Sequence, residues 1–251
     1  MDRLLIVPAA GRGSRLGVAG PKALVPVAGR PMLEHLLRRH RPFVDRFIVV
    51  VAPSAMDAFA AFAAGQDTPI DLVAQPHPTG MLDAIMLASQ LVEMHRPRRV
   101  AVTWCDQIAV ASATIERLWR RAMSSAAPAL VFATLKVEVP YIHFERNERG
   151  QIVGVRQRRE GDSMPDSGET DMGLFDLSLD AYLGDLPVFA KDARESSGTG
   201  ERNFLPFIPW LATRAVVDTI QGAAAIETVG INTPDELAAV EAHLASEPSA
   251  G

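Results

Sequence analysis

LLIVPAAGRGSRLGVAGPKALVPVAGRP, residues 4–31, is the stretch that decides how this chain is interpreted. Its apolar run stops at Pro8, and a turn built of alanines and glycines follows. Two separated cations, Arg15 and Lys22, come next. A buried strand that ends in a glycine loop with cations presents backbone N–H groups and positive charge to phosphates. The stretch therefore predicts a phosphate-binding loop directly after the first strand.

Two familiar phosphate motifs do not fit this loop. Gly11 and Gly13 match the first glycines of the dinucleotide fingerprint GxGxxG, but Leu16 stands at the third. The Walker pattern needs Gly-Lys, and Gly20 is followed by Pro21. The prolines also prevent a regular helix here. What remains is a long, extended, cationic loop, with an ordinary strand-to-helix connection as the alternative.

Composition limits the classes of protein. The chain has 251 residues, of which 48% are hydrophobic, so it can bury a substantial core. A net charge of −5 argues against nucleic acid or an anionic membrane as partner. The single cysteine, Cys105, excludes an internal disulfide framework and a multi-cysteine metal site. With no signal-peptide pattern and no apolar run of membrane-spanning length, we expect a cytoplasmic protein that is a monomer or a small homo-oligomer.

The first half of the chain alternates two kinds of segment. Continuously apolar, β-branched runs predict buried strands at 3–7, 46–52, 70–74 and 99–104. Helices are predicted between and after them, at 32–40, 55–64, 81–95 and 113–124. This alternation predicts an α/β fold with a Rossmann-like, mostly parallel sheet and helices on both faces. Ligands then bind at the carboxyl ends of the strands.

The second half is less regular. Strands are predicted at 129–136, 141–145, 152–156, 172–177, 215–220 and 225–229, and helices at 204–213 and 233–244. The polar stretches 161–170 and 194–202 are predicted to be flexible loops. We expect one domain over residues 1–245, with a first half (about 1–128), a second half containing a β-rich insertion (about 129–232), and a flexible tail (246–251).

Polar residues at strand ends are the candidates for chemistry. Asp106 follows the strand 99–104, where a carboxylate can ligate Mg²⁺ or cap a helix. Asn232 precedes the last helix and offers the same two roles. Gln75 ends its strand and Gly80 opens a helix, so they can read a pyrimidine edge, or serve only the turn.

Other constellations point the same way. Arg156, Arg158 and Arg159 form a basic cluster that binds a second phosphate or only faces solvent. The sequence shows no Ser-His-Asp or Cys-His arrangement. That pattern is consistent with phosphoryl-type transfer, which needs positioning and charge compensation more than a protein nucleophile.

With these residues in view, the chain resembles the sugar-1-phosphate nucleotidyltransferases, a family with a GT-A-like fold that includes uridylyl-, thymidylyl- and cytidylyltransferases. The resemblance is carried by residues 9–16, Pro21-Lys22-Ala23-Leu24 and residues 26–31. Weaker matches continue through residues 75–80, Asp106, 150–158, 171–173 and 230–232.

The resemblance implies an NTP-binding half (about 1–128), an acceptor-binding half (about 129–232) and roles for individual residues. Ala9, Ala10, Gly11 and Arg12 would lie along the nucleotide, and Gly13 and Arg15 would hold its β- and γ-phosphates. Lys22 would bridge the α-phosphate and the incoming phosphate. Gln75 and Gly80 would read a uracil-like base. Asp106 and Asn232 would hold Mg²⁺, with Arg15, Lys22 and Asp106 as the catalytic set.

The acceptor side departs from the family pattern. Arg158 stands where many relatives carry a phosphate-contacting lysine, Arg156 replaces a sugar-contacting glutamate, and Asp171 replaces a sugar-contacting asparagine. We expect a Mg²⁺-dependent nucleotidyltransferase acting on an NTP (UTP, CTP or dTTP favoured) and a sugar 1-phosphate. The alternatives are a non-sugar acceptor, such as phosphocholine or the molybdenum cofactor, and a non-catalytic nucleotide-binding regulator.

Overall fold

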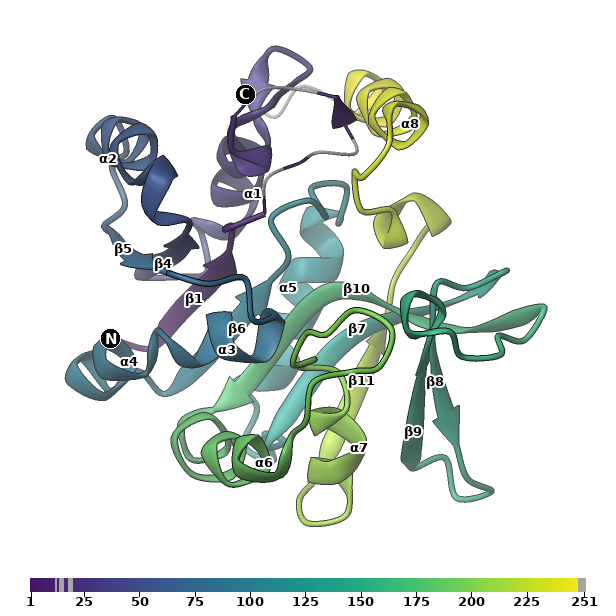
Figure 1. Cartoon of the computed structure of the whole chain (residues 1–251). Helices are drawn as coiled ribbons and strands as arrows, with labels where there is room; N and C mark the ends of the chain where they lie inside the picture. The colour runs from purple at the N-terminus through teal and green to yellow at the C-terminus, as the bar shows by residue number, and fades with distance from the viewer. Residues whose placement is uncertain (12, 14–15, 18–19, 248–251) are drawn as a thin grey trace.

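A computed structural model of the chain describes residues 1–11, 13, 16–17 and 20–247. Within them a seven-stranded sheet has the strand order β11-β7-β10-β6-β1-β4-β5 (Figure 1). Its strands are β1 (Arg3–Pro8), β4 (Arg46–Val51), β5 (Ile70–Ala74), β6 (Arg99–Thr103), β7 (Leu130–Glu138), β10 (Ser167–Ser178) and β11 (Val217–Gln221). β10 runs antiparallel to both its neighbours, β6 and β7, whereas the other pairings are parallel.

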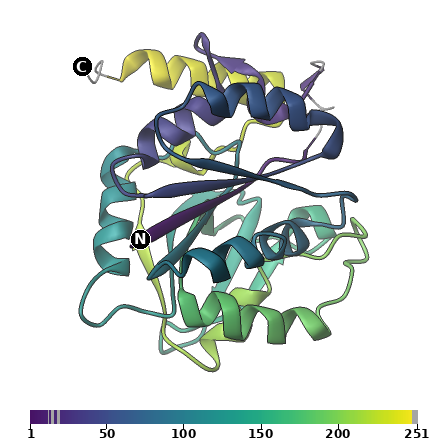
Figure 2. The ribbon, with the colours of Figure 1, turned by 90° about the vertical axis from the view of Figure 1, so that its left-hand side faces the viewer.

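Helices cover both faces of this sheet, as the edge-on view of Figure 2 shows. One face packs against α1 (Met32–His40), α2 (Met56–Ala64), α5 (Ser112–Ala122) and α8 (Pro234–Ser246). The other packs against α3 (Met81–Met86), α4 (Ser89–His95), α6 (Leu186–Asp192) and α7 (Phe207–Ala212). Successive side chains of a strand point to opposite faces, so Leu5 and Val7 join the first core and Leu4 and Ile6 the second. The continuous apolar run of β1 is explained by this double burial.

Smaller elements surround the carboxyl edge of the sheet. The antiparallel hairpin of β8 (Ile142–Arg146) and β9 (Ile152–Gln157) extends away from the main sheet in Figure 1, and the short helix η4 (Arg158–Glu160) follows it. Near the start of the chain, the short helix η2 (Lys22–Leu24) precedes the strands β2 (Pro26–Val27) and β3 (Arg30–Pro31). The predicted α/β fold, with a mixed sheet and a small β-rich insertion, is confirmed.

Some local predictions are wrong. The predicted strand 225–229 is the short helix η6 (Ala225–Thr228), because the buried Glu227 carboxylate accepts hydrogen bonds from the backbone of Ala223 and Ala224. The predicted helix 81–95 divides into α3 and α4, and the predicted helix 204–213 begins only at Phe207. Part of the predicted loop 161–170 belongs to β10.

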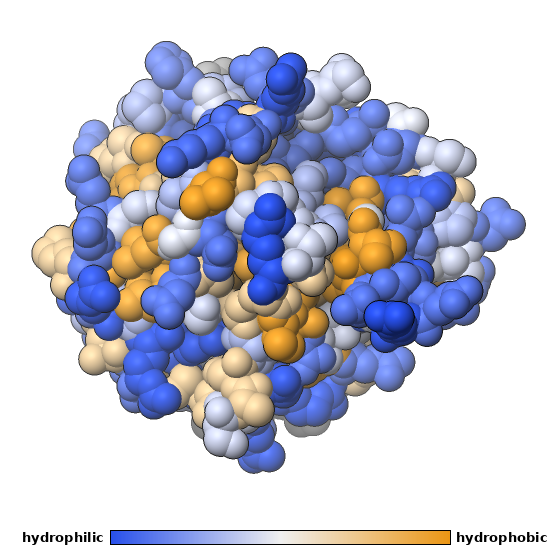
Figure 3. Space-filling model, turned by 90° about the horizontal axis from the view of Figure 1, so that it is seen from below, coloured by the Kyte–Doolittle hydropathy of each residue, from blue (hydrophilic) through white to orange (hydrophobic). Residues whose placement is uncertain are grey.

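The surface seen from below is mostly hydrophilic, with apolar residues in separate patches (Figure 3). That face therefore offers no continuous apolar contact surface. Of the helices in the described part of the chain, none has the length and apolar character needed to cross a membrane.

Candidate active site

A cavity of about 1160 Å³ opens at the carboxyl edge of the sheet. Pro8 at the end of β1, Gln75 after β5 and Asp106 after β6 all line it. Lys136 of β7, Gln157 at the end of β9 and Arg159 of η4 line its far side. Because the carboxyl ends of parallel strands meet at one edge, residues far apart in the sequence converge here, as the sequence predicts.

Lys22, Asp106 and Asn232 form the polar centre of this cavity. The Lys22 ammonium forms an ion pair with the Asp106 carboxylate and donates a hydrogen bond of 2.8 Å to Asn232 Oδ1. The side chains of Lys22 and Asp106 are 12% and 18% exposed, so the pair is largely shielded from bulk water. Three residues separated by 84 and 210 positions thus meet around one positive charge.

The local chain holds the two oxygen donors in place. Asn232 donates from Nδ2 to the carbonyl of Gly230 at 3.1 Å, which leaves Oδ1 directed at Lys22. Its backbone N–H donates to Glu236 at 2.7 Å, and Thr233 caps α8 by accepting from the Glu236 N–H. The Ile231 N–H donates to the carbonyl of Asp106 at 3.1 Å. The capping box therefore fixes the Asn232 segment at the start of α8, and the Ile231 hydrogen bond joins this segment to the Asp106 turn.

The donor set fits a hard divalent cation. Carboxylate and amide oxygens are the ligands that Mg²⁺ prefers, and Mg²⁺ is usually held by one or two carboxylates together with substrate phosphates. Asp106 and Asn232 already share a cation, the Lys22 ammonium. Among the residues that the structure describes, no group of three His, Cys, Asp or Glu side chains that could hold a metal ion is found at this position or any other, so a cation held by Asp106 and Asn232 would take its remaining ligands from phosphate and water.

The glycine loop closes one side of the cavity. Ala10 and Gly11 line it, and Ala9 is buried beneath them. The Gly11 carbonyl accepts from the Lys22 N–H at 3.3 Å. Gly13 has φ +63°, and a Cβ there would lie 3.1 Å from the Lys22 Cβ, so a glycine allows Lys22 to pack closely. Arg12 and Arg15 lie outside the described residues.

The segment 75–80, here called the base loop, forms another wall. Gln75 is 7% exposed and donates from Nε2 to the carbonyl of Gly80 at 3.3 Å. Gly80 has φ +118°, and a Cβ there would lie 2.5 Å from backbone atoms of Arg202. The glycine is therefore required by the chain that packs on it, whatever it contacts in the cavity.

The predicted acceptor residues divide into two groups. Asp171 lines the cavity and is 4% exposed, and burial raises its pKa to about 6. Arg156 and Arg158 do not line it: the Arg156 guanidinium pairs with Glu145, and Arg158 donates to the carbonyl of Pro140 at 3.2 Å.

Their sequence neighbours Gln157 and Arg159 line the cavity instead. Because successive side chains of a strand point to opposite sides, Gln157 at the end of β9 faces the side opposite to Arg156. Applied to 152–157, this alternation places Arg156 and Gln157 on opposite sides, but it does not say which of them faces the cavity. Nothing local in the sequence identifies Glu201 or Asn203, which line the same cavity from a distant loop.

Cys105, which also lines the cavity, is no nucleophile. Burial, together with the negative charge of Asp106, raises the pKa of its thiol to about 12. A thiol of this kind stays protonated and unreactive near neutral pH.

Comparison of the sequence with known protein families identifies the family of this chain. The MobA-like NTP transferase domain matches residues 5–168, well over half of the chain. The chain belongs to the MobA-like NTP transferase family. In this NTP transferase, the matched region contains the glycine loop, the base loop, Lys22 and Asp106, whereas Asn232 lies beyond it.

Curated relatives extend the match. The bifunctional protein GlmU of Cupriavidus taiwanensis is 29% identical over 250 residues, covering 94% of this chain and 51% of the relative. GlmU of Acidithiobacillus ferrooxidans is 30% identical over 244 residues, covering 94% and 50%. The NTP transferase chain thus spans about half the length of the curated relatives it matches, and it is distantly related to them.

Proposed function

We propose that this NTP transferase is a Mg²⁺-dependent nucleotidyltransferase that moves an NMP group from UTP, CTP or dTTP onto a sugar 1-phosphate. One observation carries the proposal: Lys22, Asp106 and Asn232 meet within a cavity that is also lined by the glycine loop and the base loop. A positive charge, two oxygen donors of the kind that Mg²⁺ prefers, and the walls formed by the glycine loop and the base loop are thereby combined in one cavity.

In the proposed reaction, a phosphate oxygen of the acceptor attacks the α-phosphorus of the NTP. A new P–O bond forms, the bond between the α-phosphorus and the bridging oxygen breaks, and pyrophosphate leaves with its electron pair. Such reactions need positioned charge rather than a covalent protein intermediate. The Lys22 ammonium is the group that would compensate the charge that accumulates between the two phosphates.

Asp106 and Asn232 are the residues that would hold the metal. Bound there, Mg²⁺ would offset the repulsion between the triphosphate and the attacking phosphate. Gln75, whose Nε2 is directed at the carbonyl of Gly80, keeps its Oε1 as an acceptor for a base N–H. Ala10 and Gly11 would lie beside the nucleoside, and Asp171 would contact the acceptor.

A pyrophosphate-release screen tests the proposal. Each of the four NTPs and dTTP is combined with sugar 1-phosphates, phosphocholine, phosphoethanolamine and molybdopterin, in the presence of Mg²⁺. We expect release with a pyrimidine nucleotide and a sugar 1-phosphate. Release only with a non-sugar acceptor would reassign the acceptor, and binding of NTP with no release by any pair would favour a regulatory protein.

The role of Lys22 has its own measurement. Lys22→Ala should lower turnover by about 10²–10³-fold, the range for the loss of one group that stabilises transition-state charge. Lys191→Ala, which removes a lysine from a separate cavity, is the matched control. Near-normal turnover of Lys22→Ala with the true substrate pair would show that the assigned role is wrong.

A further inference from the structure

A segment predicted to be a flexible loop is held by hydrogen bonds and ion pairs on two sides of the cavity. The predicted loop 194–202, taken together with Asn203, is here called the strap. It runs between α6 and α7, and its residues Glu201 and Asn203 line the main cavity. Its contacts with the base loop on one side and with η4 on the other carry the inference below.

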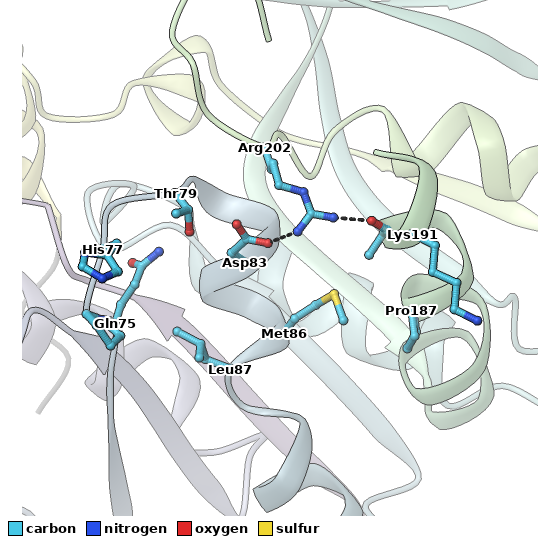
Figure 4. Close-up of a pocket in the computed structure, with 11 residues that line it drawn as sticks. Gln75, His77, Thr79, Asp83, Met86, Leu87, Pro187, Lys191 and Arg202 are labelled. Carbon is cyan, nitrogen blue, oxygen red and sulfur yellow. Dashed lines mark hydrogen bonds and ion pairs between the residues drawn. The ribbon is translucent and has the colours of Figure 1, made fainter. Parts of the chain in front are cut away.

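Arg202 anchors the strap to the nucleotide side. Its backbone N–H donates to the carbonyl of Thr79 at 2.8 Å, and its carbonyl accepts from the Leu82 N–H at 3.1 Å. Its guanidinium pairs with Asp83 of α3 and donates to carbonyls of α6 and the residue after it, Ala190 and Ala193. Figure 4 shows Arg202 reaching between Asp83 and α6 in a second cavity of about 640 Å³.

Glu160 anchors the strap to the acceptor side. Its carboxylate accepts from the Thr199 N–H at 3.2 Å, from the Thr199 hydroxyl at 3.0 Å and from Asn203 Nδ2 at 2.9 Å. A Cβ on Gly198 would lie 2.8 Å from the Glu160 Cα, so the strap backbone lies directly against η4. Beside this contact, Arg159 and Glu201 form an ion pair of 2.7 Å.

The charge state of Glu160 fixes the orientation of the Asn203 amide. Desolvation acts to raise the pKa of Glu160, but hydrogen bonds from Ser196, Asn203 and Thr199 hold it below its usual value. An ionised carboxylate can only accept hydrogen bonds. Asn203 must therefore turn its NH₂ group to Glu160 and its carbonyl oxygen away, and no donor from the described part of the chain pairs with that oxygen.

We propose that Asn203 Oδ1 is a specificity-determining contact for the acceptor and that Glu160 is the positioning residue that presents it. The inference rests on the proposed function, because it requires a phosphorylated acceptor in the main cavity. Asn203 lies on the acceptor side of the cavity and not on the nucleotide side, because Glu160 of η4 holds its side chain. The strap contacts the base loop through the backbone of a different residue, Arg202. A carbonyl oxygen selects an acceptor that carries a hydroxyl or ammonium donor.

The test compares acceptors in pairs. Initial rates of pyrophosphate release are measured with glucose 1-phosphate, N-acetylglucosamine 1-phosphate, phosphoethanolamine and phosphocholine, of which only phosphocholine lacks a hydroxyl or N–H donor beyond its phosphate. Asn203→Leu should lower kcat/KM about tenfold for the best donor-bearing acceptor, through the acceptor KM. The KM for the NTP should change less than about twofold, and each variant's thermal unfolding reports on its fold.

Glu160→Gln supplies the second arm. Its amide can donate as well as accept, so Asn203 is free to turn over, and the acceptor KM should rise several-fold. Because Glu160 acts through Asn203, the double variant Glu160→Gln/Asn203→Leu should lose no more kcat/KM for the acceptor than Asn203→Leu alone. A purely structural role would instead give additive losses in kcat. Asn203→Ser, a smaller change, replaces Asn203→Leu if the latter unfolds.

The outcomes separate the two proposals. An unchanged acceptor KM in the Asn203 variants, a change confined to the NTP KM, or additive losses in the double variant would overturn the inference and leave the proposed function standing. No pyrophosphate release by the wild-type protein with any pair would overturn the proposed function and the inference together.

Discussion

Lys22→Met should make the protein bind Mn²⁺ more tightly when no nucleotide is present. In the structure, the Lys22 ammonium lies where Asp106 and Asn232 would hold a divalent cation. A single charge and a double charge about 4 Å apart repel by about 8 kcal/mol at an effective dielectric constant of 20. The ammonium and the metal therefore cannot share the position, and the metal must displace the lysine.

The magnitude follows from the contacts that are broken. Displacing Lys22 gives up one largely shielded ion pair and one hydrogen bond, and hydrogen bonds to charged groups are worth about 1.5–3 kcal/mol. Since about 1.4 kcal/mol corresponds to a factor of ten, removing the competing ammonium should tighten metal binding about 10- to 100-fold. Methionine keeps most of the length of the side chain without its charge.

The assay is a Mn²⁺ titration followed by electron paramagnetic resonance of the free ion. Mn²⁺ serves because it shares the preference of Mg²⁺ for oxygen ligands. Lys191→Met controls for the loss of one lysine, and Asp106→Asn should abolish the site. In the wild-type protein, an NTP should strengthen Mn²⁺ binding, because its phosphates give Lys22 another partner. A Lys22→Met protein that binds Mn²⁺ no more tightly than the wild type would refute the reasoning.

Three further predictions concern stability. Burial raises the pKa of Asp171 to about 6 from the 3.8 of an ordinary aspartate, so the stability that its protonated form contributes is lost as the pH rises from about 4 to 6. Relative to Asp171→Asn, the wild-type free energy of unfolding should fall by about 2–3 kcal/mol over this window, and parallel pH profiles of the two proteins in urea denaturation would contradict this. Gly80→Ala should lower the free energy of unfolding by about 2–4 kcal/mol, because its Cβ would collide with the Arg202 backbone. The control Gly150→Ala, at φ +76° with open space around it, should lower it by about 1 kcal/mol, and an equal fall of Tm in the two variants would count against the collision. Glu236→Ala removes the acceptor for two backbone N–H groups at the start of α8 and should cost about 1 kcal/mol, measured by thermal unfolding.

The parallel core could be predicted from the sequence because its signal is local. Apart from Arg46 and Asp71, the runs that form β4 and β5 are apolar, and the predicted bounds 46–52 and 70–74 agree with the structure to within one residue. The convergence of Lys22 and Asp106 follows from the same topology, since both come after strands of one parallel sheet.

The remaining features depend on contacts with residues far away in the sequence, which the local sequence does not predict. The segment 225–229 is apolar enough for a strand, but Glu227 also accepts from the distant Ala111 N–H and stabilises a short helix. The strap is polar and glycine-rich, yet Glu160 and Asp83, far earlier in the chain, hold it in place. Whether Arg156 or Gln157 faces the cavity depends on strand register, which composition does not report.

The antiparallel strand β10 has a consequence for how the fold assembles. The strands β5, β4, β1 and β6 come from the first 103 residues, and β7 and β11 come later; β10 alone is hydrogen-bonded to both groups, through β6 and β7. The sheet is therefore continuous only after the strand of residues 167–178 has inserted between β6 and β7, both of which precede it in the chain. Because both edges of β10 are paired, its amide protons near Phe175 should exchange with solvent only when the whole sheet opens, whereas those of the edge strand β5 exchange through local opening.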